Sequence, residues 1–107
     1  MIKECNATEL KQKLEAHEKF QFIDCREQKE WEEAHIEGAK LLPLSEFEVK
    51  YEDLLKNKNE PIVIQCRSGA RSMKACIFLL SKGYTDLTNL EGGIMGWMQM
   101  GYPVKNG

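Results

Sequence analysis

The sequence predicts an α/β fold with a mainly parallel sheet of about five strands and helices on both faces. Short β-compatible segments alternate along the chain with segments of helical periodicity. The run Ile62-Val63-Ile64 has no polar face, which is typical of a central strand covered on both sides. The chain has 107 residues, of which 42% are hydrophobic and 30% charged. We therefore expect a single domain over residues 1–107 with its own core.

The first half of the chain is expected to alternate strands with helices. The strands are expected at Ile2–Cys5, Phe20–Ile23 and Ala39–Leu42. Asn6-Ala7-Thr8-Glu9 has the form of a capping box, a helix start at which two side chains bind the first free backbone N–H groups. Ser45-Glu46-Phe47-Glu48 has the same form and is expected to open a helix towards Leu55. A short charged helix is expected over Gln28–Ala34.

The second half is expected to hold a long helix, a strand and a closing helix. Between Ser72 and Leu80, four apolar side chains follow the helical spacing i, i+3, i+4, i+7, namely Met73, Cys76, Ile77 and Leu80. This stripe predicts a helix that is nearly engulfed by the core, and Gly83 is expected to end it. A strand is expected at Leu87–Leu90, and a last helix around Trp97.

Charge and hydropathy exclude several classes of function. Fifteen basic and seventeen acidic residues give a net charge of −2, so the chain lacks the general basic field used in non-specific nucleic-acid binding. The longest apolar stretch, Ala75–Leu80, is far too short to span a membrane, and no secretory signal is visible. The four cysteines form no CxxC pair and make a poor zinc site. We expect a cytoplasmic protein with reduced thiols, no metal, and no direct binding to nucleic acid or membrane.

The most informative segment is the loop that follows the central strand. Cys66 comes directly after this strand, at the turn into the next helix, where backbone N–H groups and the helix dipole favour an anion. Arg67 and Arg71 add positive charge, and Gly69 allows a tight turn. All of these features favour a nucleophilic thiolate. The alternative is a buried structural cysteine, beside which two arginines would be out of place.

Four segments of the chain form a recognisable pattern. They are Asp24-Cys25-Arg26-Glu27 with His35-Ile36-Glu37-Gly38-Ala39, then Cys66-Arg67-Ser68-Gly69-Ala70-Arg71-Ser72, then Leu90-Glu91-Gly92-Gly93-Ile94-Met95-Gly96-Trp97, and finally Gly101-Tyr102-Pro103-Val104. Together they resemble the rhodanese family, specifically its small single-domain sulfurtransferases, over nearly the whole chain. Two departures stand out: Cys25 replaces the usual aliphatic residue, and Ala34 replaces the glycine before the histidine.

The resemblance implies a three-layer rhodanese-like fold and a persulfide mechanism without a cofactor. Cys66 would be the catalytic nucleophile, taking sulfur from thiosulfate or a persulfide and passing it to a thiol or cyanide, or to a sulfur-carrier protein. The substrate-binding loop would comprise Arg67, Ser68, Gly69, Ala70, Arg71 and Ser72. Asp24 and Arg26 would support this loop. Related phosphatases of the same fold have C-x5-R, whereas Cys66 and Arg71 are spaced as C-x4-R, a loop that suits a single sulfur atom.

Several alternatives remain open at this point. The domain could be a non-catalytic regulatory or binding module, or a thiol-dependent reductase or phosphatase, arsenate reductase included. Cys25 could be a resolving thiol for Cys66 or a small core residue. Either Arg67 or Arg71 could contact the substrate, and the other could brace the loop. By resemblance His35 belongs to a structural turn rather than to the catalytic machinery.

Overall fold

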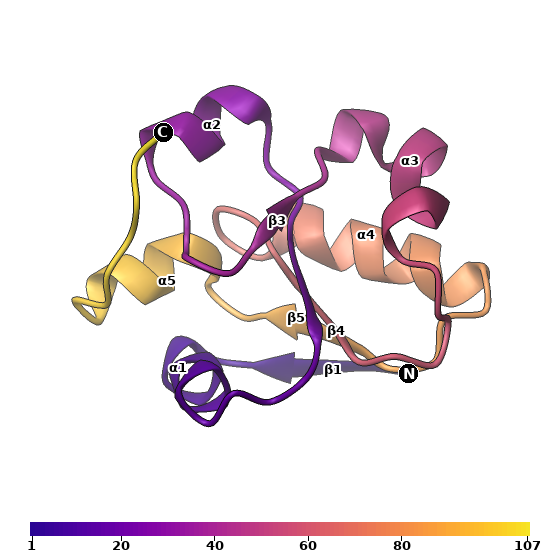
Figure 1. Cartoon of the computed structure of the whole chain (residues 1–107), viewed down its shortest axis with the longest axis horizontal. Helices are drawn as coiled ribbons and strands as arrows, with labels where there is room; N and C mark the ends of the chain where they lie inside the picture. The colour runs from indigo at the N-terminus through magenta and orange to yellow at the C-terminus, as the bar shows by residue number, and fades with distance from the viewer.

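A five-stranded sheet in the order β1-β5-β4-β2-β3 forms the middle of the computed structural model, which describes residues 1–107 (Figure 1). The strands are β1 (Ile2–Cys5), β2 (Gln21–Asp24), β3 (Lys40–Leu41), β4 (Ile62–Gln65) and β5 (Leu87–Leu90). Every neighbouring pair is parallel, as the sequence predicts. Strand β4 is central and all of its residues are buried, which confirms the interpretation of its apolar run.

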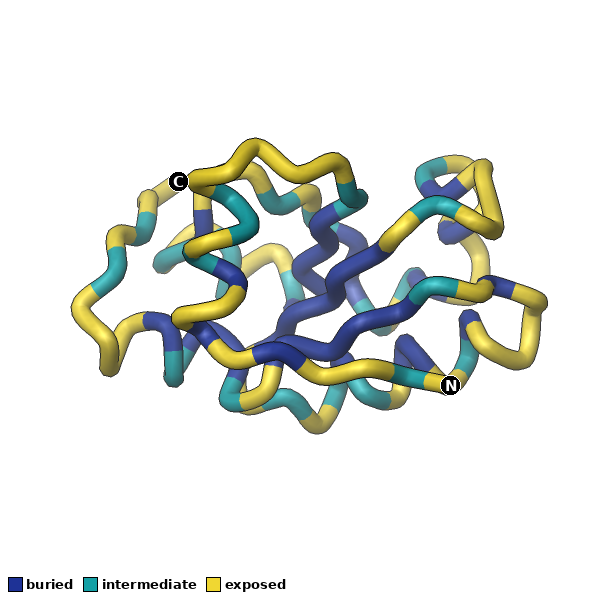
Figure 2. The backbone as a smooth tube through the Cα atoms, turned by 90° about the horizontal axis from the view of Figure 1, so that it is seen from below, coloured by how far each residue is buried: buried dark blue, intermediate teal, exposed yellow.

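Helices cover both faces of this sheet and complete the three layers. They are α1 (Ala7–Glu15), α2 (Gln28–Glu33), the 3₁₀ turn η1 (Leu44–Glu46), α3 (Phe47–Leu54), α4 (Ala70–Ser81) and α5 (Gly93–Gln99). One core cluster contains residues of α3 and α4, and a second contains residues of α1 and α5. Strand β4 contributes to both, with Ile62 and Ile64 on one face and Val63 on the other, because successive strand residues point in opposite directions. Figure 2 shows the buried strands between largely exposed outer segments.

One of the two predicted capping boxes is present. Asn6 accepts the Glu9 N–H at 2.8 Å, and the Glu9 side chain accepts the Asn6 N–H at 2.9 Å. The second prediction is wrong: α3 begins at Phe47 without a side-chain cap. Ser45 instead lies in η1 and donates its hydroxyl to the Glu27 carboxylate at 2.7 Å. Glu27, which lies 18 residues earlier in the chain, binds the Ser45 hydroxyl, so Ser45 does not cap the helix as its local pattern predicts.

Helix α4 differs from the prediction in its buried face. Its buried residues are Ser72, Ala75, Cys76 and Leu79. Ile77 is 55% exposed and Leu80 is 39% exposed, so the helix is covered on one side only and the expectation of an engulfed helix is wrong. Gly83 ends the helix as predicted, with a φ of 92° and its N–H on the Leu80 carbonyl. None of the helices combines the length and the apolar character needed to cross a membrane.

Candidate active site

The site lies where β2 and β4 end side by side. Asp24 pairs with Gln65 in the parallel ladder, so Cys25 and Cys66 follow at the same edge of the sheet. After Cys66 the chain turns into α4, and Gly69 precedes the helix in the left-handed conformation with a φ of 108°. This turn directs the Gly69 N–H onto the Cys66 sulfur at 3.1 Å. The glycine expected to let the loop curl therefore also supplies a donor.

Ser72 and Asn89 complete the polar surroundings of the Cys66 sulfur. The Ser72 hydroxyl lies 3.4 Å from Cys66 Sγ and also within hydrogen-bond distance of Asn89 Oδ1. Asn89 Nδ2 donates to the Gly69 carbonyl at 3.2 Å, so Asn89 fixes both the serine and the loop. Asn89 belongs to none of the site motifs recognised in the sequence. The feature that identifies Asn89 is a polar side chain within a buried strand. Asn89 is only 2% exposed, and a buried polar group of this kind needs a hydrogen-bond partner.

These contacts make Cys66 the most acidic thiol of the chain. Its pKa falls to about 4, first because the Cys25 thiol donates a hydrogen bond to it, and further because Ser72 and Gly69 donate to it. Burial acts in the opposite direction and is outweighed. The same contact with Cys66, together with burial, raises the pKa of Cys25. The pair is therefore a thiolate at Cys66 beside a protonated thiol at Cys25.

Helix α5 binds the backbone carbonyls of the loop after Cys66, which point towards the helix and away from the sulfur. The N–H groups of Ile94 and Met95 donate to the carbonyls of Cys66 and Arg67 at 2.9 and 3.1 Å. This close approach requires Gly93, because a Cβ there would lie 2.5 Å from the Cys66 carbonyl oxygen. Gly92 and Gly93 enter the sequence prediction only as part of the family segment Leu90–Trp97, because this contact with the loop depends on tertiary packing.

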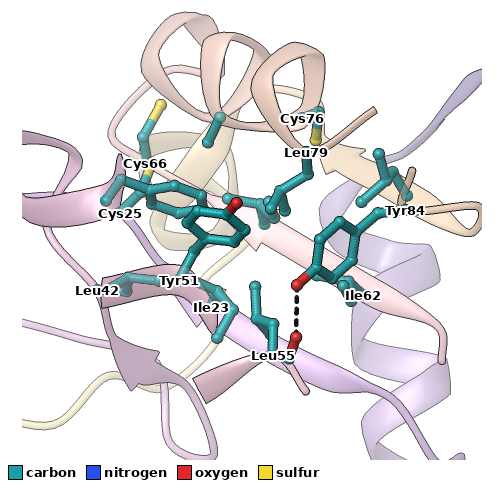
Figure 3. Packing of buried hydrophobic residues seen from close by; sticks show 14 residues of the cluster. Ile23, Cys25, Leu42, Tyr51, Leu55, Ile62, Cys66, Cys76, Leu79 and Tyr84 are labelled. Carbon is teal, nitrogen blue, oxygen red and sulfur yellow. Dashed lines mark hydrogen bonds between the residues drawn. The ribbon is translucent and has the colours of Figure 1, made fainter. Parts of the chain in front are cut away.

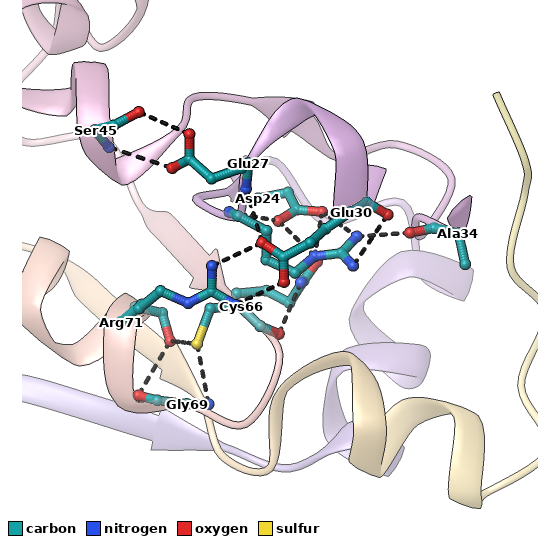
Figure 4. Close-up of polar contacts among 11 residues, drawn as sticks. Asp24, Glu27, Glu30, Ala34, Ser45, Cys66, Gly69 and Arg71 are labelled. Carbon is teal, nitrogen blue, oxygen red and sulfur yellow. Dashed lines mark hydrogen bonds and ion pairs between the residues drawn. The ribbon is translucent and has the colours of Figure 1, made fainter. Parts of the chain in front are cut away.

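The two loop arginines have different partners. Arg71 donates from both terminal nitrogens to the two carboxylate oxygens of Glu30 at 2.8 Å each, as Figure 4 shows. The ion pair lowers the pKa of Glu30 to about 2. Arg67 is exposed and has no carboxylate partner, and its Nε donates to the thioether of Met95 at 3.2 Å. The charge of Arg71 is thus neutralised within the protein, whereas that of Arg67 faces solvent.

Asp24 and Arg26 form a buried ion pair beneath α2. Arg26 donates to Asp24 from Nε and from a terminal nitrogen, the latter at 2.8 Å, and their side chains are 6% and 0% exposed. Arg26 also donates to the backbone carbonyls of Glu30 and Ala34, so it holds α2 at the end of β2 (Figure 4). None of the hydrogen bonds of this pair reaches Cys66. The pair contacts the loop only indirectly: Arg26 donates to the Glu30 carbonyl, and the Glu30 carboxylate binds Arg71.

The Cys66 side chain is nearly covered, at 1% exposure. The exposed part of the loop is formed by Arg67, Ser68 and Ala70. A surface cleft of about 580 Å³ opens beside Arg67, between α2 and α5. It is lined by Arg26, Glu30, Glu33, Ala34, Arg67, Ile94, Met95 and Met98. The sulfur therefore lies just under a loop whose outer edge borders this cleft.

The other cysteines and His35 lie apart from this arrangement. Cys5 belongs to the core cluster on the opposite face of the sheet, and Cys76 is buried on α4; all four cysteines are free thiols. His35 stacks on Trp31 with ring centroids 3.8 Å apart, and its backbone bridges to Lys105. The histidine thus lies in an isolated β-bridge just before the turn at Glu37 and Gly38.

Comparison with known proteins agrees with the fold. The chain is 35% identical over 104 residues to a sulfurtransferase of Allochromatium vinosum, covering 97% of this chain and 95% of that one. It is 41% identical over 96 residues to the putative sulfurtransferase YtwF of Bacillus subtilis, covering 90% of each. The crystal structure of a rhodanese-related protein from Thermoplasma volcanium superposes with a TM-score of 0.82 at 30% identity, covering 96% of this chain and 97% of that one. The sequence model of the rhodanese-like domain matches residues 6–100, and the chain belongs to this family.

Proposed function

We propose that this protein is a sulfurtransferase that carries sulfane sulfur on Cys66. The observation that supports it best is the Cys66 sulfur held by the Gly69 N–H at 3.1 Å and the Ser72 hydroxyl at 3.4 Å, with a pKa of about 4. A thiolate is the nucleophilic form of cysteine, so Cys66 is ionised at neutral pH without a neighbouring base. Two similar proteins are named as a sulfurtransferase and a putative sulfurtransferase, in line with this chemistry.

Thiosulfate serves as the model donor for the first step. The Cys66 thiolate attacks its outer sulfur, a new S–S bond forms, and the S–S bond of thiosulfate breaks with its electron pair leaving on sulfite. The product is a Cys66 persulfide. Its negative charge lies within reach of the loop N–H groups and the amino end of α4, both of which stabilise an anion.

The second step returns the enzyme to its starting form. The thiolate of an acceptor, or cyanide, attacks the outer persulfide sulfur, and the Cys66 thiolate leaves. A protein persulfide can replace thiosulfate as donor, and a sulfur-carrier protein can replace the small acceptor, because the exchanged bond is the same. Each half-reaction is complete with the cysteine as the only sulfur carrier, which gives ping-pong kinetics.

Arg67 is the donor-binding residue of this proposal. Its guanidinium is exposed at the edge of the cleft and has no carboxylate partner, so it is free to bind the oxyanion end of the donor. Arg71, by contrast, is engaged by Glu30 and acts as a positioning residue for the loop. Because Cys66 is nearly covered, the donor sulfur must enter past the exposed loop residues next to Arg67.

The test is sulfur loading followed by intact mass. Reduced wild-type protein incubated with thiosulfate is expected to gain the mass of one sulfur atom, which cyanide or dithiothreitol then removes. Cys66→Ser abolishes the gain. Cys5→Ser and Cys76→Ser, which replace buried thiols elsewhere, leave it intact. A wild-type protein that gains no sulfur from thiosulfate, a glutathione persulfide or a protein persulfide contradicts the proposal.

A further inference from the structure

Cys25 and Cys66 occupy matched positions on two neighbouring strands. Asp24 pairs with Gln65, and the Cys25 N–H still donates to the Gln65 carbonyl at 2.9 Å, so the ladder continues up to the two cysteines. Neighbouring strands lie about 4.8 Å apart. A disulfide requires Cα atoms about 4.4–6.8 Å apart. The backbone therefore brings the two cysteines within disulfide reach without any rearrangement of the sheet.

Their side chains also point to the same side of the sheet. Both belong to the core cluster under α3 and α4, and Figure 3 shows them next to each other. The side-chain contact between them lowers the pKa of Cys66 and raises that of Cys25. Cys5 lies in the cluster on the opposite face, and neither Cys5 nor Cys76 has such a contact. Cys25 is thus the single thiol placed to react with Cys66.

We propose that Cys25 is a resolving thiol, which captures Cys66 as a reversible disulfide when a hydroperoxide oxidises it. In the first step the Cys66 thiolate attacks one peroxide oxygen and the O–O bond breaks. The leaving hydroxide or alkoxide takes up a proton, and Cys66 becomes a sulfenic acid. In the second step the Cys25 sulfur attacks the Cys66 sulfur and the S–O bond breaks. The leaving hydroxide takes the Cys25 proton as water, and a small thiol or dithiol later reduces the disulfide.

The charge on Cys66 determines whether Cys25 reacts with it, and this charge differs between sulfur transfer and oxidation. The contact with Cys66 and the negative charge of its thiolate both raise the pKa of Cys25, in addition to burial. A persulfide keeps a negative charge on the bound sulfur, so Cys25 stays protonated and the sulfane sulfur is retained for an acceptor. A sulfenic acid is neutral and its sulfur is electrophilic, so this cause is removed and Cys25 can attack it while its proton passes to the leaving hydroxide. The consequence is protection: Cys66 is held as a disulfide instead of progressing to sulfinic and sulfonic acids, of which the sulfonic is irreversible.

The decisive measurement uses the reduced wild-type protein and a several-fold molar excess of hydrogen peroxide, because each oxidation step from thiol to sulfonic acid consumes one peroxide. The expected product has lost two hydrogens, and non-reducing peptide mapping links the Cys25 and Cys66 peptides within one chain. Dithiothreitol restores a free thiol at Cys66, measured by its alkylation. Wild-type protein that instead accumulates sulfinic acid at Cys66, or that links Cys66 to a second chain, overturns the proposal.

Cys25→Ser is the matched variant, because its hydroxyl keeps a hydrogen-bond donor beside Cys66. It is expected to accumulate sulfinic and sulfonic acids at Cys66 under the same treatment, so that dithiothreitol restores less than one-tenth of the alkylatable Cys66. Cys76→Ser, a buried thiol outside the pair, behaves as wild type. Thiosulfate loading of the reduced protein is measured in parallel. Because alkylation reports the thiol directly, a disulfide that forms in a protein unable to load sulfur refutes the proposed function and leaves this inference standing.

Discussion

Arg71 and Glu30 are joined by two parallel hydrogen bonds of 2.8 Å, which tie the loop after Cys66 to helix α2. Both side chains are about one-third exposed, at 33% and 29%. Because of this ion pair, the two arginines of the loop have different roles. Arg71 is neutralised and fixes the loop, and Arg67 keeps its charge for a ligand.

Glu30→Gln is expected to strengthen the capture of anionic donors. The substitution removes a carboxylate from the cleft and releases the charge of Arg71 next to Cys66. We expect the KM for thiosulfate to fall about two- to fivefold, as for the loss of a partly exposed ion pair worth about 0.5–1 kcal/mol. Steady-state kinetics with cyanide as acceptor measures this change. Glu33→Gln removes a carboxylate from the same cleft without an ion-pair partner, and an equal effect of both variants would refute the role of Arg71.

Arg67→Ala is expected to weaken the use of thiosulfate. A charge-assisted hydrogen bond to the donor, worth about 1.5 kcal/mol, is lost, so the KM should rise about tenfold. An uncharged polysulfide donor should load Cys66 at nearly the wild-type rate, since it has no oxyanion to bind. Lys74→Ala, which removes an exposed cation of α4, is the control. Unchanged thiosulfate kinetics in Arg67→Ala would exclude this residue from the donor site.

The reactivity of Cys66 is expected to be independent of pH across the neutral range. With a pKa of about 4, the thiol is ionised above this value, and its reactivity is lost only as the pH falls through about 4. An unperturbed cysteine would lose it below about pH 8.5. The rate of iodoacetamide alkylation of Cys66, followed by peptide mass from about pH 3 to 9, gives the midpoint directly. A midpoint near that of a free cysteine would remove the basis for an unassisted thiolate.

Ser72→Ala is expected to move this midpoint upward. The variant removes a hydrogen bond of 3.4 Å to the thiolate, and the loss of about 1.5 kcal/mol corresponds to a rise in pKa of about one unit. The alkylation profile of Cys66 reads out this rise. Ser81→Ala, an exposed serine at the other end of α4, should leave the profile unchanged. An identical midpoint in both variants would show that Ser72 does not stabilise the thiolate.

Gly93→Ala is expected to disrupt the loop and destabilise the protein. The new Cβ would lie 2.5 Å from the Cys66 carbonyl oxygen, at a residue with a φ of 56°. We expect a loss of more than about 3 kcal/mol in the free energy of unfolding, measured by urea denaturation, together with loss of sulfur loading. Gly101→Ala has the same left-handed backbone, with a φ of 77°, but open space around it, and should cost only about 1–2 kcal/mol. Equal losses in the two variants would mean that strain alone, without the contact to the loop, explains Gly93.

Features decided by neighbours in sequence could be predicted well. The apolar run of β4, the capping box at Asn6 and the glycine end of α4 at Gly83 each depend on residues a few positions apart. The loop from Cys66 to Arg71 belongs to this class in part, because Gly69 and Ser72, which donate to its thiolate, follow Cys66 directly in the chain.

Features that depend on contacts between distant parts of the chain could not be predicted from the sequence. Ser45 fits a capping box, yet Glu27 binds its hydroxyl, and the acidity of Cys66 depends first on Cys25, some forty residues earlier in the chain. The sequence by itself determined that the chain forms a parallel α/β sheet with a thiolate-forming loop after its central strand, since local backbone preferences and spacing specify both. Only the tertiary structure decided which arginine is free and which thiol stands beside the nucleophile. Both depend on which strands and helices become neighbours, and strand pairing and packing set this over distances that no local pattern spans.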